Sequence, residues 1–121
     1  MPELMPHEIM VWDVFPAVRR ELAKALITEQ GLKQKDAAEL LGITEAAVSQ
    51  YLSAKRGQRI TFTAPVLREI RRSAAVLAAD ASKLIAELYR IIRLKPVQRT
   101  MCAIHRTKSS TLPRNCSICK L

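Results

Sequence analysis

The stretch LKQKDAAELLGITEAAVSQYLSAKRG, residues 32–57, decides how this chain folds. Its first half, residues 34–41, has the pattern of a short amphipathic helix and ends at Gly42, a residue that readily adopts a left-handed helix cap. Thr44 is then a good N-cap for a second helix over residues 45–53. Two short helices joined across a tight Gly-Ile-Thr turn are typical of a helix-turn-helix unit.

The two faces of this unit separate apolar from polar side chains. The small Ala37 in the middle of the first helix lets the second helix approach closely. Five apolar side chains are expected to point inward: Ala38, Leu41, Ile43, Val48 and Leu52. The outward face of the second helix carries short or polar side chains: Glu45, Ala46, Ser49 and Gln50. Because a glutamine amide can pair bidentately with adenine in a major groove, this face suits the reading of base edges.

A further helix precedes the unit. Pro16 stands where a first helical turn tolerates proline, and apolar residues recur at helical spacing as far as Gly31. The pattern predicts a helix over residues 16–30 that this glycine closes. Three aromatic residues flank apolar helix faces, and we expect them in the core: Trp12, Phe15 and Tyr51.

Residues 32–57 resemble the helix-turn-helix of Cro and phage-repressor-type regulators. The shared core has the form A-x-x-L-G-[IV]-T-x-x-x-V-S-x-[YW], which is fairly specific. With VWDVFPAVRRELAKAL before it, the stretch is similar to archaeal predicted transcriptional regulators of that class, over residues 9–57. The resemblance therefore covers close to half of the chain.

The resemblance implies roles in DNA binding for nine residues. Gln34, with Lys35 beside it, would hold a phosphate at a helix N-terminus. Five residues would face the bases: Thr44, Glu45, Ala46, Ser49 and Gln50. Lys55 and Arg56 would contact backbone phosphate. One departure is Lys33, which stands where such sequences usually have a Ser or Thr N-cap, so the cap of that helix is weaker.

The segment after Gly57 begins with an extended connector, residues 58–62, and then becomes helical. Thr63 is the expected N-cap, with Pro65 in the first turn. Eight apolar residues then recur at alternating intervals of three and four, and we name them the heptad seam: Leu67, Ile70, Ala74, Leu77, Ala81, Leu84, Leu88 and Ile91. Such a seam favours pairing with a second copy of the chain. The alternative is the packing face of two consecutive helices that bend near residues 80–82.

Two pairs of metal-binding residue types lie near the C-terminus. Cys102-Ala-Ile-His105 is followed, ten residues later, by Cys116-Ser-Ile-Cys119. Thiolate and imidazole ligands on two tight turns suit a closed tetrahedral zinc site that orders a structural knuckle. The alternative cofactor for Cys102, His105, Cys116 and Cys119 is an iron–sulfur cluster, which would make the protein a redox sensor.

The composition predicts an all-α fold, because aromatic residues are 4% of the chain and glycine occurs three times, while helix-forming residues dominate. We expect a helix-turn-helix DNA-binding domain over residues 1–62, a helical dimerisation segment over 63–95 and a metal knuckle over 96–121. The chain has no apolar run of membrane-spanning length, and its first 20 residues do not resemble a secretory signal. We expect a cytoplasmic protein.

The positive charge is concentrated at one end. The net charge is +9, and residues 88–121 contain eight Lys and Arg and no Asp or Glu. This distribution favours a polyanionic partner, most commonly nucleic acid, over a merely solvated tail. A thiol enzyme built on Cys102 and His105 would lack an orienting carboxylate there, so we expect no enzymatic activity.

Together these patterns predict a sequence-specific transcription regulator. It would bind double-stranded DNA as a homodimer through the recognition helix, residues 45–53, with a small effector or a redox signal as further partners. One alternative is an iron–sulfur redox-sensing regulator that uses the C-terminal Cys/His site. A further alternative is a basic RNA- or ribosome-associated protein, in which the helix-turn-helix serves only as a packing unit.

Overall fold

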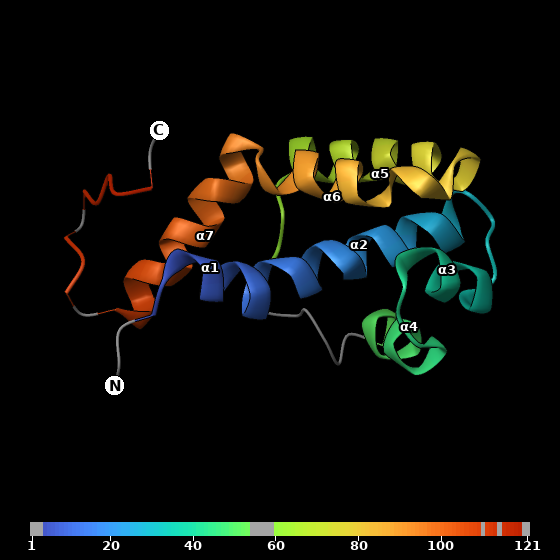
Figure 1. Cartoon of the computed structure of the whole chain (residues 1–121), viewed down its shortest axis with the longest axis horizontal. Helices are drawn as coiled ribbons and strands as arrows, with labels where there is room; N and C mark the ends of the chain where they lie inside the picture. The colour runs from blue at the N-terminus through green and yellow to red at the C-terminus, as the bar shows by residue number, and fades with distance from the viewer. Residues whose placement is uncertain (1–3, 54–59, 110, 114, 120–121) are drawn as a thin grey trace.

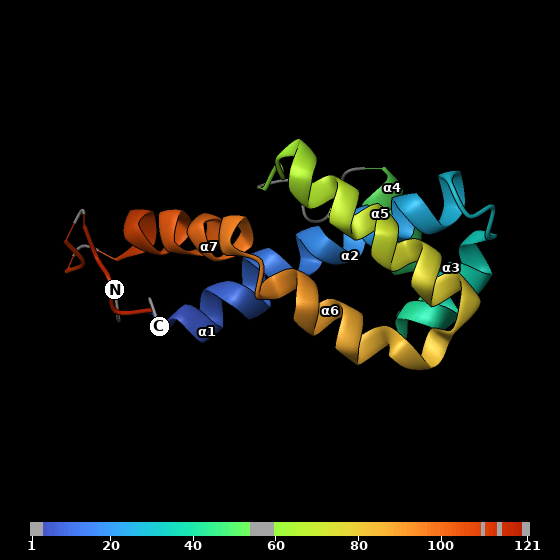
Figure 2. The same ribbon diagram turned by 90° about the horizontal axis from the view of Figure 1, so that it is seen from above.

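The computed structural model describes residues 4–53, 60–109, 111–113 and 115–119. The described residues are helical and contain no strand, which confirms the all-α prediction. The elements in chain order are α1 (Pro6–Ile9), the π-helical turn η1 (Met10–Val14), α2 (Phe15–Thr28), α3 (Gln34–Leu41), α4 (Glu45–Leu52), α5 (Ala64–Ala79), the 3₁₀ turn η2 (Ala81–Lys83), α6 (Leu84–Ile92) and α7 (Lys95–Lys108). The molecule is elongated, with α7 and the α3–α4 pair toward opposite ends (Figures 1 and 2).

The first 28 residues contain one long helical run instead of a helix that begins near Pro16. Helical backbone already starts at Pro6 and passes through η1 into α2. Proline has no N–H, and in a regular α-helix its ring clashes with the carbonyl four residues earlier. The helix is wider at η1, because the N–H of Phe15 donates to the carbonyl of Met10, five residues earlier, as in a π-helix. The π-turn lets the run continue past Pro16.

The two short helices lie where the sequence predicts them. α3 has the predicted bounds, and α4 ends one residue earlier than expected, at Leu52. Gly42 closes α3 with a φ of 69°, and its N–H bonds the carbonyls of Ala38 and Glu39. Gly31 has a φ of 73° in the loop after α2. Both glycines adopt the left-handed conformation in which a side chain would be strained.

Helix α2 is the centre of the packing. Its side chains Val18, Leu22 and Leu26 have no exposed surface. Helices α3 and α4 pack on α2, and α5 also packs on it. The inward-facing Ala38, Leu41 and Val48 of the helix-turn-helix unit are buried as predicted.

A hydrogen bond from a side chain of α2 joins this helix to the segment that precedes α5. The Nη2 of Arg20 donates to the carbonyl of Ile60 at 2.7 Å, and the same guanidinium pairs with Glu21 at 3.1 Å. Ile60 and Phe62 are buried beside it, within the described part of the predicted connector. Thr63 is the N-cap residue of α5, although its side chain makes no capping hydrogen bond.

The heptad seam is divided between two helices. Asp80 ends α5 with extended backbone, and its carboxylate accepts hydrogen bonds from the Ser82 N–H at 3.1 Å and from the Ser82 hydroxyl at 2.6 Å. These two bonds lower the pKa of the Asp80 carboxyl. The chain turns through η2, and α6 returns beside α5 (Figure 2).

Polar side chains also join α5 to α6. Arg90 of α6 donates to Glu69 at 2.6 Å and to the hydroxyl of Ser73 at 2.7 Å. The Ser73 hydroxyl in turn donates to Glu87 at 2.7 Å, which satisfies a residue with no exposed surface. This network fixes the two helices against each other.

The two-helix interpretation of the seam is therefore confirmed. Four seam residues are at most 1% exposed in the core of this chain: Ile70, Ala74, Leu77 and Ile91. Leu67, Leu84 and Leu88 are partly buried against the same core. Of the eight seam residues only Ala81 is exposed, so in this packing the seam offers little surface to a second copy.

Helix α7 packs against α1 and η1, toward the end of the molecule away from α3 and α4 (Figure 1). Its buried face consists of Val97, Met101 and His105. Lys108 pairs with Asp13 of η1 at 2.8 Å. Buried residues from all three predicted segments of the chain belong to one hydrophobic cluster, from Ile9 to Met101.

The aromatic residues divide into core and surface. Tyr51 is 4% exposed, which confirms its prediction. Phe15 is half-buried beneath the guanidinium of Arg19, 5.4 Å from the ring centroid. The core prediction for Trp12 is wrong, since its side chain is 76% exposed on the π-turn. None of the helices in the described parts of the chain is long and apolar enough to span a membrane.

The internal position of the seam predicts how two substitutions affect stability. Leu77→Ala should lower the free energy of unfolding by about 2–5 kcal/mol, because it leaves a cavity between α5 and its neighbours. Arg72→Ala, at an exposed position on the same helix, should change it by less than about 0.5 kcal/mol. Urea unfolding measures both. Similar losses at the two positions would contradict this packing.

Candidate nucleic-acid interface

Helix α4 is held at its start by the predicted cap. The hydroxyl oxygen of Thr44 accepts a hydrogen bond from the N–H of Ala47 at 3.0 Å, which satisfies one of the unpaired donors at the helix N-terminus. Ala47, Val48 and Tyr51 form the buried side of α4. The predicted base-facing Thr44 therefore already uses its oxygen to fix the helix.

The opposite side of α4 is open to solvent. Glu45, Ala46 and Ser49 are exposed, as the predicted DNA-reading face requires. Gln50 is only half-buried, and its Oε1 is fully covered without a hydrogen-bond partner among the described residues. A covered polar atom without a partner costs about 1–3 kcal/mol. A rotation of the Gln50 amide outward, toward a donor, would recover this cost.

The predicted phosphate-binding residues lie at the start of α3. Gln34 is the first residue of this helix, and Lys35 follows it, both exposed. Lys33 is the N-cap residue and makes no side-chain cap bond, in agreement with the weaker cap expected from the sequence. The first N–H groups of α3 thus lack a side-chain cap from this residue, and helix N-termini bind phosphate through such groups. Lys55 and Arg56 lie outside the described residues.

The C-terminal Cys and His residues are arranged differently from the prediction. Cys102 and His105 lie one turn apart on the regular helix α7, not on a tight turn. Cys116 and Cys119 lie in a non-helical segment, where the N–H of Cys116 bonds the carbonyl of Pro113 at 3.1 Å. Among the described residues, no group of three or more Cys, His, Asp or Glu side chains has an arrangement that could hold a metal ion.

Three thiols nevertheless come near one another. Burial raises the pKa of the Cys119 thiol, and the neighbouring Cys102 and Cys116 thiols, the former through a hydrogen bond as well, raise it further. Cys102 and Cys119 both pack against the core. The Nε2 of His105 donates to the carbonyl of Leu4, so this ring is fixed between α7 and the start of the chain.

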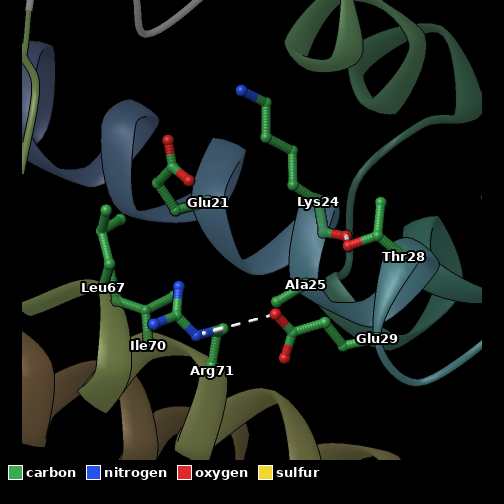
Figure 3. Close-up of a pocket in the computed structure, with 8 residues that line it drawn as sticks. All are labelled: Glu21, Lys24, Ala25, Thr28, Glu29, Leu67, Ile70 and Arg71. Atoms are coloured by element: carbon green, nitrogen blue, oxygen red, sulfur yellow. Dashed lines mark hydrogen bonds and ion pairs between the residues drawn. The ribbon is translucent and has the colours of Figure 1, made fainter. Parts of the chain in front are cut away.

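A small hollow lies between α2 and α5, on the side away from this cluster. Its volume is about 150 Å³, below the roughly 300–1,000 Å³ of typical ligand pockets. Figure 3 shows Arg71 of α5 directed at Glu29, with Nε and Oε1 3.6 Å apart, and Lys24 extending away from this pair. A hollow of this volume is too small to be assigned as an effector site.

Comparison with known proteins identifies the class of this region. A protein family described as helix-turn-helix matches residues 22–61, which include the second half of α2, both short helices and residues 58–61. Neither a curated protein nor a solved structure matches the chain. The match supports a helix-turn-helix of the Cro type in residues 22–61 and, with it, DNA binding.

One group of charged residues was missed from the sequence. Lys95, Arg99 and Arg106 share one exposed face of α7. The sequence showed their charge but not their common face, because residues 96–121 were interpreted as a metal knuckle instead of a helix. The spacing of four and seven residues was the available indication.

Proposed function

We propose that the chain is a sequence-specific transcription regulator that places α4 in the major groove of double-stranded DNA. The observation that carries this proposal is the exposed polar face of α4 within a region that matches a helix-turn-helix family. In such domains the second helix enters the groove and its N-terminal residues contact base edges. Glu45 and Ala46 occupy that end of α4, and Ser49 follows one turn later.

Each exposed side chain has a chemically suitable target in the groove. A glutamate carboxylate accepts from the amino group of cytosine, and an alanine methyl contacts the methyl of thymine. Gln50 is suited to adenine, which offers both a donor and an acceptor to an amide. The covered Oε1 of Gln50 has no hydrogen-bond donor among the described residues, and adenine would supply one. Gln34 and Lys35 would meanwhile fix the register by contacts with phosphate.

The proposed reading face predicts a loss of sequence discrimination in Gln50→Ala. The affinity ratio between a duplex selected from a random pool and a scrambled duplex should fall by about tenfold, since a bidentate base contact contributes about 1–3 kcal/mol. Gln30→Ala, the same change at an exposed position outside α3 and α4, is the matched control and should preserve the ratio. Fluorescence anisotropy at matched salt measures both.

Two results would contradict the proposal. One is an unchanged affinity ratio in Gln50→Ala. The other is a wild-type chain that binds single-stranded RNA as tightly as its selected duplex, which would favour the RNA-associated alternative.

We further propose that the regulator binds as a homodimer, with two copies of α4 in successive major grooves about 34–36 Å apart. The heptad seam is not available for this contact, because it is internal. Large apolar side chains that remain exposed support a contact between copies elsewhere: Trp12 at 76%, Ile85 at 80% and Tyr89 at 58%. Exposed aromatic and aliphatic groups of this size are typical anchors of protein interfaces.

The dimer proposal predicts a mass in solution of twice 13.6 kDa. Ile85→Asp should reduce the mass to that of one chain, because a dimer contact would bury an unpaired charge. The exposed Thr107→Asp on α7 is the control and should leave the dimer intact. Sedimentation of each variant measures the mass, and a monomeric wild-type chain at micromolar concentration would refute the dimer.

We also propose that Cys102, His105, Cys116 and Cys119 hold zinc. The hydrogen bond between the Cys102 and Cys119 thiols supports this pair of donors, and metal binding would have to bring the other two ligands to them. The bond from the Nε2 of His105 to a backbone carbonyl supports it further, because metal-binding histidines commonly donate their second ring nitrogen to such a group. This bond leaves Nδ1 as the ligand atom. Zinc would order the segment after α7, which has little apolar mass of its own.

The metal proposal predicts one zinc per chain by elemental analysis of protein purified without oxygen. Cys116→Ser should abolish the zinc and make residues 111–119 sensitive to protease, as a chelator should, while the neighbouring Ser117→Ala should do neither. Iron with a matching amount of sulfide would contradict the zinc proposal and favour the iron–sulfur redox sensor. The absence of both metals would contradict the cofactor proposal altogether.

A further inference from the structure

Helix α7 carries three cations on one face. Successive residues of an α-helix are rotated by about 100°, so Lys95, Arg99 and Arg106 lie within about 40° of one another. They are opposite the buried Val97 and Met101, and all three are exposed. We call these three residues the α7 stripe.

The α7 stripe has no counter-charge in the described structure. None of its three side chains forms an ion pair or hydrogen bond with a described residue, and residues 88–121 contain no Asp or Glu. The acidic groups of the adjoining elements are already engaged. Asp13 of η1 pairs with Lys108 at 2.8 Å, and Glu8 of α1 accepts from the N–H of Met5 at 2.9 Å. Lys108 lies toward the buried side of α7 and does not belong to the stripe.

The stripe and the reading helix are attached to the same support. Helix α7 packs on α1 and η1, whereas α4 packs on α2. The elements α1, η1 and α2 together form one helical run over residues 6–28. At 1.5 Å per residue this run is roughly 35 Å long, about one turn of B-DNA. Both views place α7 toward the opposite end of the molecule from α4 (Figures 1 and 2).

We propose that the α7 stripe binds the phosphate backbone of the duplex that α4 reads, within about one helical turn of the base contacts. This inference rests on the proposed function. An uncompensated row of cations loses few favourable contacts when it binds phosphate, and it gains the entropy of the counterions that leave the DNA. Because phosphate carries no sequence information, the stripe adds affinity and not specificity.

The test compares two duplexes with the same selected site. One ends at the edge of the site, and the other extends about one helical turn beyond it on both sides. Wild-type protein should bind the extended duplex more tightly. The triple variant Lys95→Gln, Arg99→Gln, Arg106→Gln should lose that advantage: its affinity for the extended duplex should fall about tenfold, and its salt slope by about 2–3 units. Its affinity for the short duplex should be unchanged.

Two control variants separate local contact from general charge and from folding. Arg68→Gln, Arg72→Gln, Lys83→Gln removes three exposed cations from α5 and η2 and should keep the advantage of the extended duplex. Lys95→Arg, Arg99→Lys, Arg106→Lys keeps the charge of the stripe and should keep the salt slope. Circular dichroism verifies that each variant is folded.

Two outcomes with the triple variant overturn the inference. One is an equal loss on the short and extended duplexes, and the other is a stripe variant that keeps its full advantage on the extended duplex. Failure of the proposed function can be distinguished from failure of this inference. In that case the wild-type chain would not prefer its selected site over scrambled DNA, yet its affinity could still depend on duplex length. Loss of the charge-retaining variant's salt slope would likewise count against a phosphate contact.

Discussion

The burial of α2 is the constraint on which the rest of the structure depends. Val18, Leu22 and Leu26 have no exposed surface, because α3 and α4 cover one part of this helix and α5 covers another. Apolar area of this kind contributes about 25 cal/mol per Å² removed from water. The two short helices are too short to be stable alone, so their position is set by this contact. The position of the exposed face of α4 is therefore set by packing within the chain.

The same long helical run explains why the molecule has two separate polar ends. Its C-terminal part, α2, supports α4, and its N-terminal part, α1 and the π-turn η1, supports α7. The α5–α6 pair completes the core with side chains that the sequence displays as one uninterrupted seam. Asp80 decides this arrangement, since its two hydrogen bonds with Ser82 stop α5 and start the turn.

The helix-turn-helix unit was predictable because its determinants are local. Gly42 and Thr44 fix the turn through backbone conformation and one cap bond, and α3 occurs at the predicted residues. The division of the heptad seam was harder to predict, because periodicity is the same whether the partner helix belongs to this chain or to another. Trp12 was misassigned since the π-turn rotates the helix surface, and no periodic pattern shows such a turn in advance. The path of α7 was missed because its Cys and His residues suggested turns.

The central claim is that the exposed face of α4 reads duplex DNA, and a titration of the ¹⁵N-labelled chain with its selected duplex tests it most directly. The amide resonances that change most should be those of α4 and of the first turn of α3, while amides on the buried side of α5 stay close to their free positions. Changes confined to α7 and the residues after it, with α4 unaffected, would contradict the claim and leave the protein a general phosphate binder.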